Sequence, residues 1–198
     1  KYNRGEISID ISNSYLKLNK KDSALWILTQ GEKEGLDVFT KYAKIRFTEQ
    51  KGKVYLEKKK FLKALSYLEE TQKLADNYDN VAGSIFYYEN LAECYFKLKK
   101  YNKAIQVMLK GIAAKKQNTK EYFLVNDYKT LAKFYKQSGN LQKSNEYYEK
   151  YVLNQKAFEN SKKDILTSFH SKKVSDLELE KELQKTRTTS YVIGSSIF

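Results

Sequence analysis

The side chains that could do chemistry in this 198-residue sequence are few and scattered. The single cysteine, Cys94, has no histidine near it, and the single histidine, His170, lies in a charged segment. A nucleophile needs a neighbouring base to become reactive, so we expect a packed thiol at Cys94 and a solvated ring at His170. The pair Glu69 and Glu70 has the charged surroundings of a solvated helix face. The spacings of a phosphate loop, a metal cluster and a dinucleotide fold are all missing. We therefore predict a protein that is not an enzyme and uses no cofactor or metal.

The composition favours helices and a positively charged surface. The sequence contains no proline and only 8 glycines, and Lys, Leu, Glu and Tyr are abundant. Its 37 basic and 24 acidic residues give a formal charge of +13, which suggests an anionic partner. Arginine, however, occurs only at Arg4, Arg46 and Arg187, and the lysines are spread over every segment and interleaved with Asp and Glu. We therefore favour a solvated, lysine-rich helical surface and predict no direct nucleic-acid binding. A binding affinity for nucleic acid that does not change with salt concentration would support this prediction.

The elements that carry these residues repeat at a fixed spacing of 40 positions. Small residues form the first column, at Ser12, Gly52, Ala92 and Ala132. A tyrosine lies three positions later, at Tyr15, Tyr55, Tyr95 and Tyr135. A second small column lies twelve positions after the first, at Ala24, Ala64, Ala104 and Ser144. Self-similarity at a fixed period indicates an array of repeated units.

The residue types in these columns predict closely packed helical hairpins. Two helices joined by a short turn approach closely only where side chains are small, and a large side chain from the partner fills the remaining space. The turns should lie at the short polar segments 19–22, 58–60, 99–100 and 138–140. Because one hairpin cannot bury its apolar face alone, neighbouring hairpins should stack into a continuous core.

These columns resemble the tetratricopeptide repeat family, in which a small residue, an aromatic residue and a later alanine mark each helix pair. The resemblance implies an all-α fold, an α-α superhelix (a TPR-like solenoid) of about four helix pairs plus a C-terminal helix. The units would lie near residues 1–38, 39–78, 79–118 and 119–158. The spacing of 40 exceeds the usual period of about 34, and the family's tryptophan and proline are missing. We attribute the extra residues to longer first helices, over Asp79–Leu98 and Thr119–Gln137.

The family binds peptides in a groove lined by the first helix of each pair. In the family, the groove positions are counted from the small residue of each unit. Carried over to this chain, they are Asn13, Arg46, Glu49, Lys53, Phe86, Glu89, Glu93, Asn126, Lys129 and Lys133. Asparagine side chains at these positions could bond to a peptide backbone, and lysines could meet its carboxylates. The alternative is that these residues are solvated and bind nothing.

The segment after residue 158 loses the repeat. Residues 159–190 are charged and favour a helix, with a sparse apolar stripe at Ile165, Phe169, Leu177, Leu179 and Leu183. This helix could cap the last repeat, or extend away as a connector or short coiled coil. Residues 191–198 are uncharged and could begin a membrane span, or form an apolar tail that docks on the array.

The combination of repeats, a charged helix and an apolar end resembles a class of membrane-anchored bacterial regulators, with repeats outside and a helix-turn-helix or histidine-kinase module inside. We therefore expect a piece of a longer protein that binds a protein or peptide ligand. It would be the sensor or interaction region of a transcriptional regulator or signalling protein. The protein would be anchored in the inner membrane with this domain extracytoplasmic (periplasmic), and a second copy of the chain is a further candidate partner. The alternative is a cytosolic scaffold or adaptor without an anchor. Lysine-rich flanks prefer the cytoplasm, which weighs against the periplasmic location.

Overall fold

The computed structural model describes residues 4–33, 40–77, 87–117 and 120–195. The helices in this part of the chain are α1 (Arg4–Lys17), α2 (Lys21–Lys33), α3 (Lys41–Glu57), α4 (Phe61–Asp76), α5 (Tyr87–Lys97), α6 (Tyr101–Lys116), the 3₁₀ helix η3 (Glu121–Leu124), α7 (Val125–Gln137) and α8 (Leu141–Ser195). The described residues contain no strand, so the predicted all-α solenoid is confirmed.

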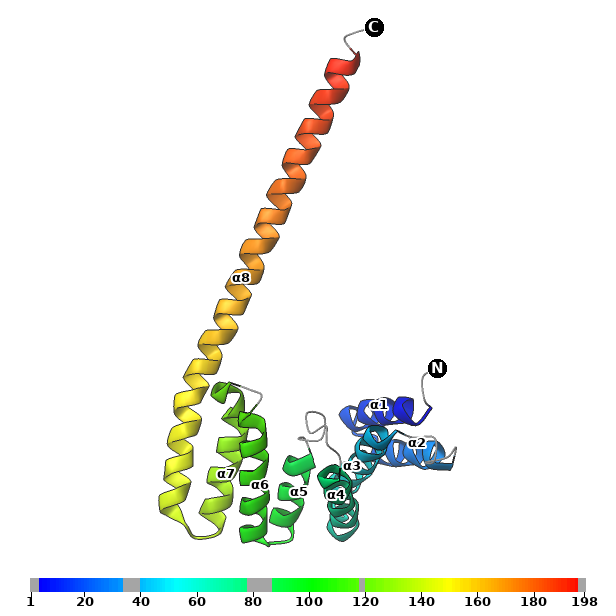
Figure 1. Cartoon of the computed structure of the whole chain (residues 1–198), viewed down its shortest axis with the longest axis vertical. Coiled ribbons are helices and arrows are strands. Elements are labelled where there is room, and N and C mark those ends of the chain that lie inside the picture. The colour runs from blue at the N-terminus through cyan, green and yellow to red at the C-terminus, as the bar shows by residue number, and fades with distance from the viewer. Residues whose placement is uncertain (1–3, 34–39, 78–86, 118–119, 196–198) are drawn as a thin grey trace.

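Each odd-numbered helix packs most extensively on the helix that follows it, giving the pairs α1–α2, α3–α4, α5–α6 and α7–α8. The pairs then stack in chain order, from the N-terminal pair at one end of the array to α7–α8 at the other (Figure 1). The turns within the pairs lie at residues 18–20, 58–60, 98–100 and 138–140, close to the polar segments that predicted them.

The small residues lie where the helices approach most closely. Gly52 of α3 is buried against Leu68 of α4, and a methyl group added at Gly52 would lie 2.6 Å from Leu68 Cγ. Likewise, a methyl group on Gly111 would lie 2.7 Å from Tyr88 Cβ. Since carbon atoms in contact are normally separated by about 3.5–4.0 Å, these positions exclude any larger side chain.

The tyrosine column packs in the space that the small residues leave. Tyr55 stacks on Tyr67 and Tyr135 stacks on Tyr147, with ring centroids 5.4 Å apart in each pair. Tyr95 is buried in the main core, and its hydroxyl donates to Glu69 Oε1 at 2.6 Å. The column therefore has the common packing role that its spacing predicted.

The expected long first helices are only partly present. Over the segment expected to be one helix from Thr119, the 3₁₀ helix η3 comes first and α7 begins only at Val125. Lys120, just before η3, is extended, and no side chain caps either start, so the chain forms a tight i→i+3 turn before it becomes α-helical. For the other expected long helix, α5 begins at Tyr87 in the described residues, and the part from Asp79 to Phe86 lies outside them.

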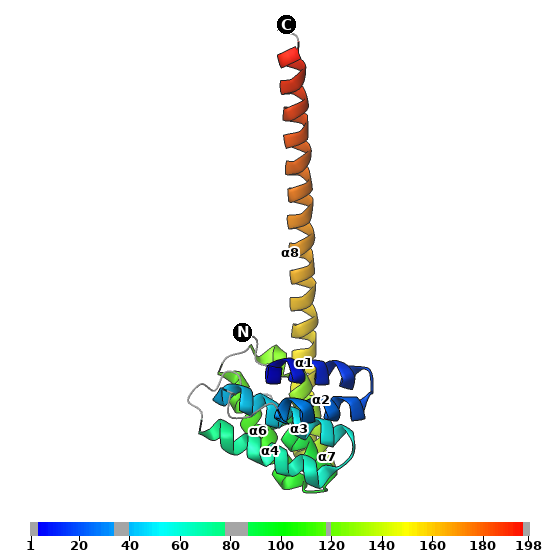
Figure 2. The ribbon, with the colours of Figure 1, turned by 90° about the vertical axis from the view of Figure 1, so that its right-hand side faces the viewer.

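Helix α8 joins the last repeat and the C-terminal segment without a break. It has 55 residues, which at 1.5 Å per residue is about 80 Å. Figures 1 and 2 show that its distal part projects from the array. Of the two arrangements considered for this segment, the helix has the extended one, because Ile165 is 66% and Leu179 59% exposed instead of packed on the repeats. Among the described helices, none is long and apolar enough to cross a membrane.

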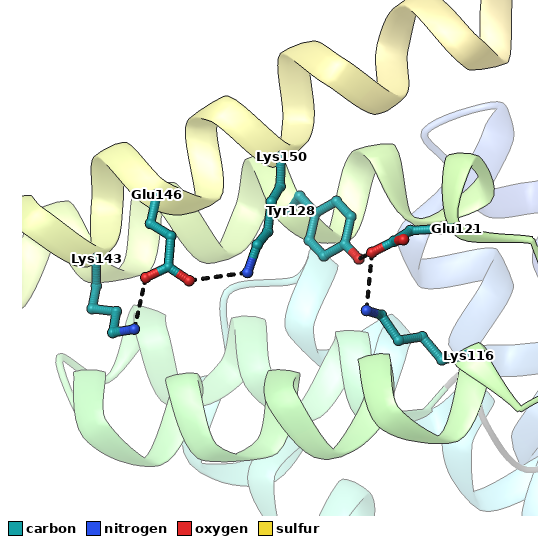
Figure 3. Close-up of polar contacts among 6 residues, drawn as sticks. All are labelled: Lys116, Glu121, Tyr128, Lys143, Glu146 and Lys150. Atoms are coloured by element: carbon teal, nitrogen blue, oxygen red, sulfur yellow. Dashed lines mark hydrogen bonds and ion pairs between the residues drawn. The ribbon is translucent and has the colours of Figure 1, made fainter.

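Polar contacts fix the base of α8 to the last hairpin. Ser144 Oγ donates to the carbonyl of Ala132 at 2.9 Å. Figure 3 shows Glu146 between two lysines of the same helix, with its carboxylate 2.7 Å from Lys143 Nζ and 3.0 Å from Lys150 Nζ. Hydrogen bonds from these lysines lower the pKa of Glu146.

A second cluster, also drawn in Figure 3, ties η3 to α6 and α7. Glu121 accepts from Tyr128 Oη at 2.6 Å and from Lys116 Nζ at 2.9 Å. These two bonds hold the pKa of Glu121 below its ordinary value, while burial raises the pKa of Tyr128. The short 3₁₀ turn is therefore held against both helices that it connects.

Candidate functional site

The odd-numbered helices α3, α5 and α7 line a shared face, called here the first-helix side. A cavity of about 250 Å³ opens on it. Its lining residues are Leu56, Glu57, Glu89, Asn90, Glu93, Met108, Asn126, Asp127 and Thr130. Three predicted groove residues, Glu89, Glu93 and Asn126, therefore lie around one cavity although they come from two different helices.

Lys115 organises the acidic residues of this cavity. Its ammonium group contacts Glu89 and bonds to both carboxylate oxygens of Asp127, at 2.8 and 3.1 Å. Burial lowers the pKa of Lys115, but its hydrogen bonds to Asp127 and Glu89 outweigh that effect and leave the pKa raised. Burial raises the pKa of Asp127, since the carboxylate is almost fully enclosed. Lys115 thus stays charged and offsets part of the negative charge of the cavity.

Glu93 and Glu57 carry the rest of that charge. Glu93 forms an ion pair with Lys97 at 3.2 Å on the same helix, and Glu57 one with Lys21 at 3.8 Å. Both glutamates are partly exposed, so these pairs are weak and leave the carboxylates accessible to a ligand. The cavity is therefore an acidic site on a chain whose formal charge is +13.

Other predicted groove residues bond to the neighbouring repeat. Lys53 Nζ donates to Asn13 Oδ1 at 3.1 Å, across 40 positions of sequence. Arg46 forms an ion pair with Asp10 at 3.5 Å. These contacts tie α1 to α3, so they give the side chains a role in the stacking of repeats.

Glu49 has the same kind of role between α3 and α5. Its carboxylate accepts from Asn90 Nδ2 at 3.2 Å. Burial raises the pKa of Glu49, and this effect outweighs the opposing influence of Lys53 and Asn90. Ionised Glu49 is therefore held in an environment that favours its neutral form.

The remaining groove candidates lie toward the C-terminal end of the array. Lys129 Nζ is 5.6 Å from the ring centroid of Tyr151, and Lys133 Nζ is 4.7 Å from that of Phe96, both within cation–π range. Both lysines are exposed. Phe86 lies outside the described residues.

The two residues first considered for catalysis lie in different surroundings. Cys94 is buried, its thiol donates to the carbonyl of Phe61 at 3.2 Å, and burial raises its pKa to about 11. A thiol with a raised pKa is a poor nucleophile at neutral pH. His170 is exposed on α8. Across the described residues, no three His, Cys, Asp or Glu side chains are grouped as a metal would require.

Sequence reasoning missed the ion pair between Lys115 and Asp127, which offsets part of the negative charge of the cavity. Asp127 lies next to Val125 and Tyr128 in the apolar stripe of α7, and an acid at a core position is a signal of a buried ion pair. Nothing in the local sequence of Lys115 distinguishes it from the other lysines, since its partners belong to α5 and α7.

Three comparisons place the fold among known proteins. Residues 45–117 match the family model described as Tetratricopeptide repeat. A search of the curated proteins found no match.

Solved structures resemble the chain at low sequence identity. The crystal structure of BtubC from P. vanneervenii has a TM-score of 0.70 at 16% identity, over 78% of this chain and 64% of BtubC. A STAND protein with a tetratricopeptide repeat sensor, from Pyrococcus horikoshii, has a TM-score of 0.69 at 17% identity, over 76% of this chain and 23% of that protein. The TPR domain of Arabidopsis FLU has a TM-score of 0.55 at 20% identity, over 60% of this chain and 99% of that domain. The chain thus spans about two thirds of BtubC and about a quarter of the STAND protein.

Proposed function

We propose that the chain binds an extended peptide segment of a partner protein on its first-helix side. Residues 45–117 match the tetratricopeptide repeat model, the helix pairs on either side share the fold, and tetratricopeptide repeat domains generally bind protein partners. The cavity around Glu89, Glu93 and Asn126 carries this proposal. It lies where three repeats meet, so one peptide lying across them would contact several units at once.

The chemistry of the cavity selects the peptide. The carboxylates of Glu57, Glu89 and Glu93 would accept from a lysine or arginine side chain. The amide of Asn126 can both donate to and accept from a peptide backbone. Lys129 and Lys133, farther along α7, would meet an acidic residue. The expected ligand therefore has a basic residue in the cavity and an acidic residue toward the C-terminal end of α7.

Selection from a random peptide library displayed on phage tests this proposal. Peptides selected on the intact chain should share a basic residue and should lose at least about tenfold in affinity when Glu93→Arg reverses the charge of the cavity. Glu159→Arg, an equal change on the exposed surface of α8, should leave binding unchanged. If the library yields no binders, or if both variants bind equally, the cavity is not the site.

The wider role that we propose is that of a sensor region in a membrane-anchored bacterial regulator. The similar STAND protein carries its tetratricopeptide repeats as a sensor. Helix α8 runs without a break from the last hairpin through the charged segment 159–190 to Ser195, so it supplies a continuous connector beyond the repeats. A ligand that contacts α7 would act on the base of this connector, and the helix would carry the change toward an anchor that follows.

A cytosolic scaffold is the alternative, and the lysine-rich flank before residue 191 supports it. Fractionation of the full-length protein in its own cells separates the two proposals. A protein that stays in the membrane fraction after alkaline carbonate washing, with its repeats cleaved by protease added outside the inner membrane, supports the sensor. Recovery in the soluble fraction overturns it and leaves the peptide-binding proposal intact.

The exposed apolar stripe of α8 supports a homodimer. Ile165 and Phe169 are four positions apart, as are Leu179 and Leu183, and the second pair follows the first by 14 positions, or two heptads. This is the spacing of a coiled-coil seam, although Lys172 and Asp176 interrupt it. A second copy of α8 would cover these side chains, which are at least half exposed in one chain. Light scattering of the intact chain should then give twice the monomer mass.

A further inference from the structure

The turns within the four hairpins share an unusual backbone conformation. Asn19, Lys59, Lys99 and Gly139, spaced 40 positions apart, all have positive φ, at 57°, 57°, 60° and 86°. Glycine adopts this conformation freely and asparagine tolerates it, whereas other side chains are strained there. The first and fourth units therefore have the residues that the turn prefers. The second and third units have lysine.

The next position repeats this conflict between residue type and local structure. Lys60 and Lys100 are the N-cap residues of α4 and α6, and neither side chain caps its helix. Asn140 at the corresponding position of the fourth unit does form a cap, since its Oδ1 accepts from the amide of Lys143 at 3.0 Å. Lysine is a poor N-cap, and its charge is unfavourable beside the positive end of a helix. At four positions in two turns, lysine thus replaces a residue that would fold better.

These turns form one continuous edge of the array. Lys58 pairs with Asp22, which joins the first and second turns. The Cys94 thiol of α5 bonds to the carbonyl of Phe61 at the start of α4, directly after the second turn. The third and fourth share a cleft of about 500 Å³ lined by Lys99, Lys100, Tyr101, Asn102, Lys103 and Ser138.

The edge carries a row of accessible positive charge. Its members, which we call the lysine edge, are Lys20, Lys59, Lys60, Lys63, Lys99, Lys100 and Lys103. All seven are exposed, and none of them forms an ion pair with another described residue. Three of them recur at the same place in successive units, at Lys20, Lys60 and Lys100. The α5–α6 and α7–α8 turns lie at the end of the array opposite to the C-terminal end of α8 (Figure 1).

We propose that the lysine edge is a second docking surface, which binds an acidic segment of a partner protein. Residues that are unfavourable for the local backbone conformation, and that recur on one surface, are expected where a binding function requires them at a cost in folding stability. The edge contains no arginine, the residue suited to bidentate binding of phosphate, so carboxylates fit it better than nucleic acid does. The amide of Asn102 and the hydroxyl of Ser138 in the cleft would bond to the backbone of such a segment.

The substitutions that test this proposal come from the fourth unit of the chain itself. The variant Lys59→Gly, Lys60→Asn, Lys99→Gly, Lys100→Asn should have a higher melting temperature, because it removes the strained lysines and restores the caps. Its affinity for a fluorescent peptide of twelve alternating Glu and Ser residues should fall at least about tenfold at 0.15 M salt. The control variant Lys162→Gln, Lys163→Gln, Lys172→Gln, Lys173→Gln removes the same charge from α8 and should keep the affinity of the unchanged chain.

Each result decides the question. A higher melting temperature with peptide binding lost only in the turn variant supports the lysine edge. Equal losses of affinity in the two variants mean that peptide binding depends only on the net charge of the chain, which overturns the proposal. Tighter binding of duplex DNA or RNA than of the peptide, abolished by the same turn variant, assigns the edge to nucleic acid and also overturns it. Glu93→Arg changes the cavity and leaves the lysine edge intact. Its effect on peptide binding therefore tests the cavity independently of the lysine edge.

Discussion

The repeat array and the distal half of α8 have similar composition and opposite environments. Both are rich in Lys, Glu and Leu. In the array, Leu68 and Leu91 are fully buried, while Leu179 and Leu183 on α8 remain 59% and 55% exposed. The difference lies in the small residues. Where Gly or Ala recurs at the helix contacts, another helix packs against the leucines, and where the recurrence ends, the helix continues alone.

The largest expected effect is the loss of a core leucine. Leu68→Ala should lower the free energy of unfolding by about 2–5 kcal/mol, because Leu68 fills the space left by Gly52 and its removal leaves a cavity. Urea denaturation followed by circular dichroism measures the loss. A change below about 1 kcal/mol would mean that the helices do not pack closely at this contact.

The next effect is overpacking at a small position. Ala92 is fully buried in the main core, so Ala92→Leu should destabilise the chain by about 1–3 kcal/mol. Ala157→Leu on the exposed surface of α8 is the matched control and should change stability little. Equal stability of Ala92→Leu and the unchanged chain would contradict the packing role given to the small column.

A smaller effect should come from Glu49, whose raised pKa opposes folding when it is ionised. The folded state holds the proton more tightly than the unfolded state, so this group favours folding at low pH, and its contribution is lost as the pH rises above the ordinary value of 4.5. Glu49→Gln should therefore raise the free energy of unfolding at pH 7 by less than about 1 kcal/mol. The free energy of unfolding of this variant should also fall less between pH 4 and pH 7 than that of the unchanged chain. Glu149→Gln, on an exposed face of α8, should leave that pH dependence as it is. A lower stability of Glu49→Gln at pH 7 would mean that ionised Glu49 stabilises the fold.

The smallest effect on the fold should come from the distal helix. Leu179→Ala should change the free energy of unfolding of the array by less than about 0.5 kcal/mol, since the side chain is mostly exposed. The same substitution should lower the mass measured by light scattering toward that of a monomer if α8 pairs with a second copy. An unchanged mass with a clear loss of array stability would place Leu179 against the repeats.

The period in the sequence predicted the hairpins because their closest contacts involve equivalent positions in every unit. Gly52 and Ala92 are small for the same reason, and the resulting columns are visible without coordinates. The start of α7 was not predictable in this way, because apolar residues keep helical spacing through η3 although the backbone tightens there. The chemistry of the cavity was also hidden. The Lys115–Asp127 pair joins α6 to α7, and periodicity within one helix carries no information about partners on another.

The left-handed lysines show a further limit of the sequence. Lys59 and Lys99 belong to polar segments that correctly predicted turns, yet their backbone conformation became visible only in the structure. Comparison with Gly139 at the same position then identifies them as locally unfavourable. The sequence therefore locates a turn, whereas the structure is needed to identify which residues of that turn are unfavourable for folding.

Amide hydrogen exchange tests most directly whether the array, and not the projecting helix, is the binding region. The intact chain is compared alone and with a peptide selected from the library. The account predicts slower exchange on binding in residues 87–97 and 125–133, which line or flank the cavity, and no change beyond residue 160 of α8. Protection confined to the distal half of α8, or spread evenly along the chain, would contradict a peptide site on the first-helix side.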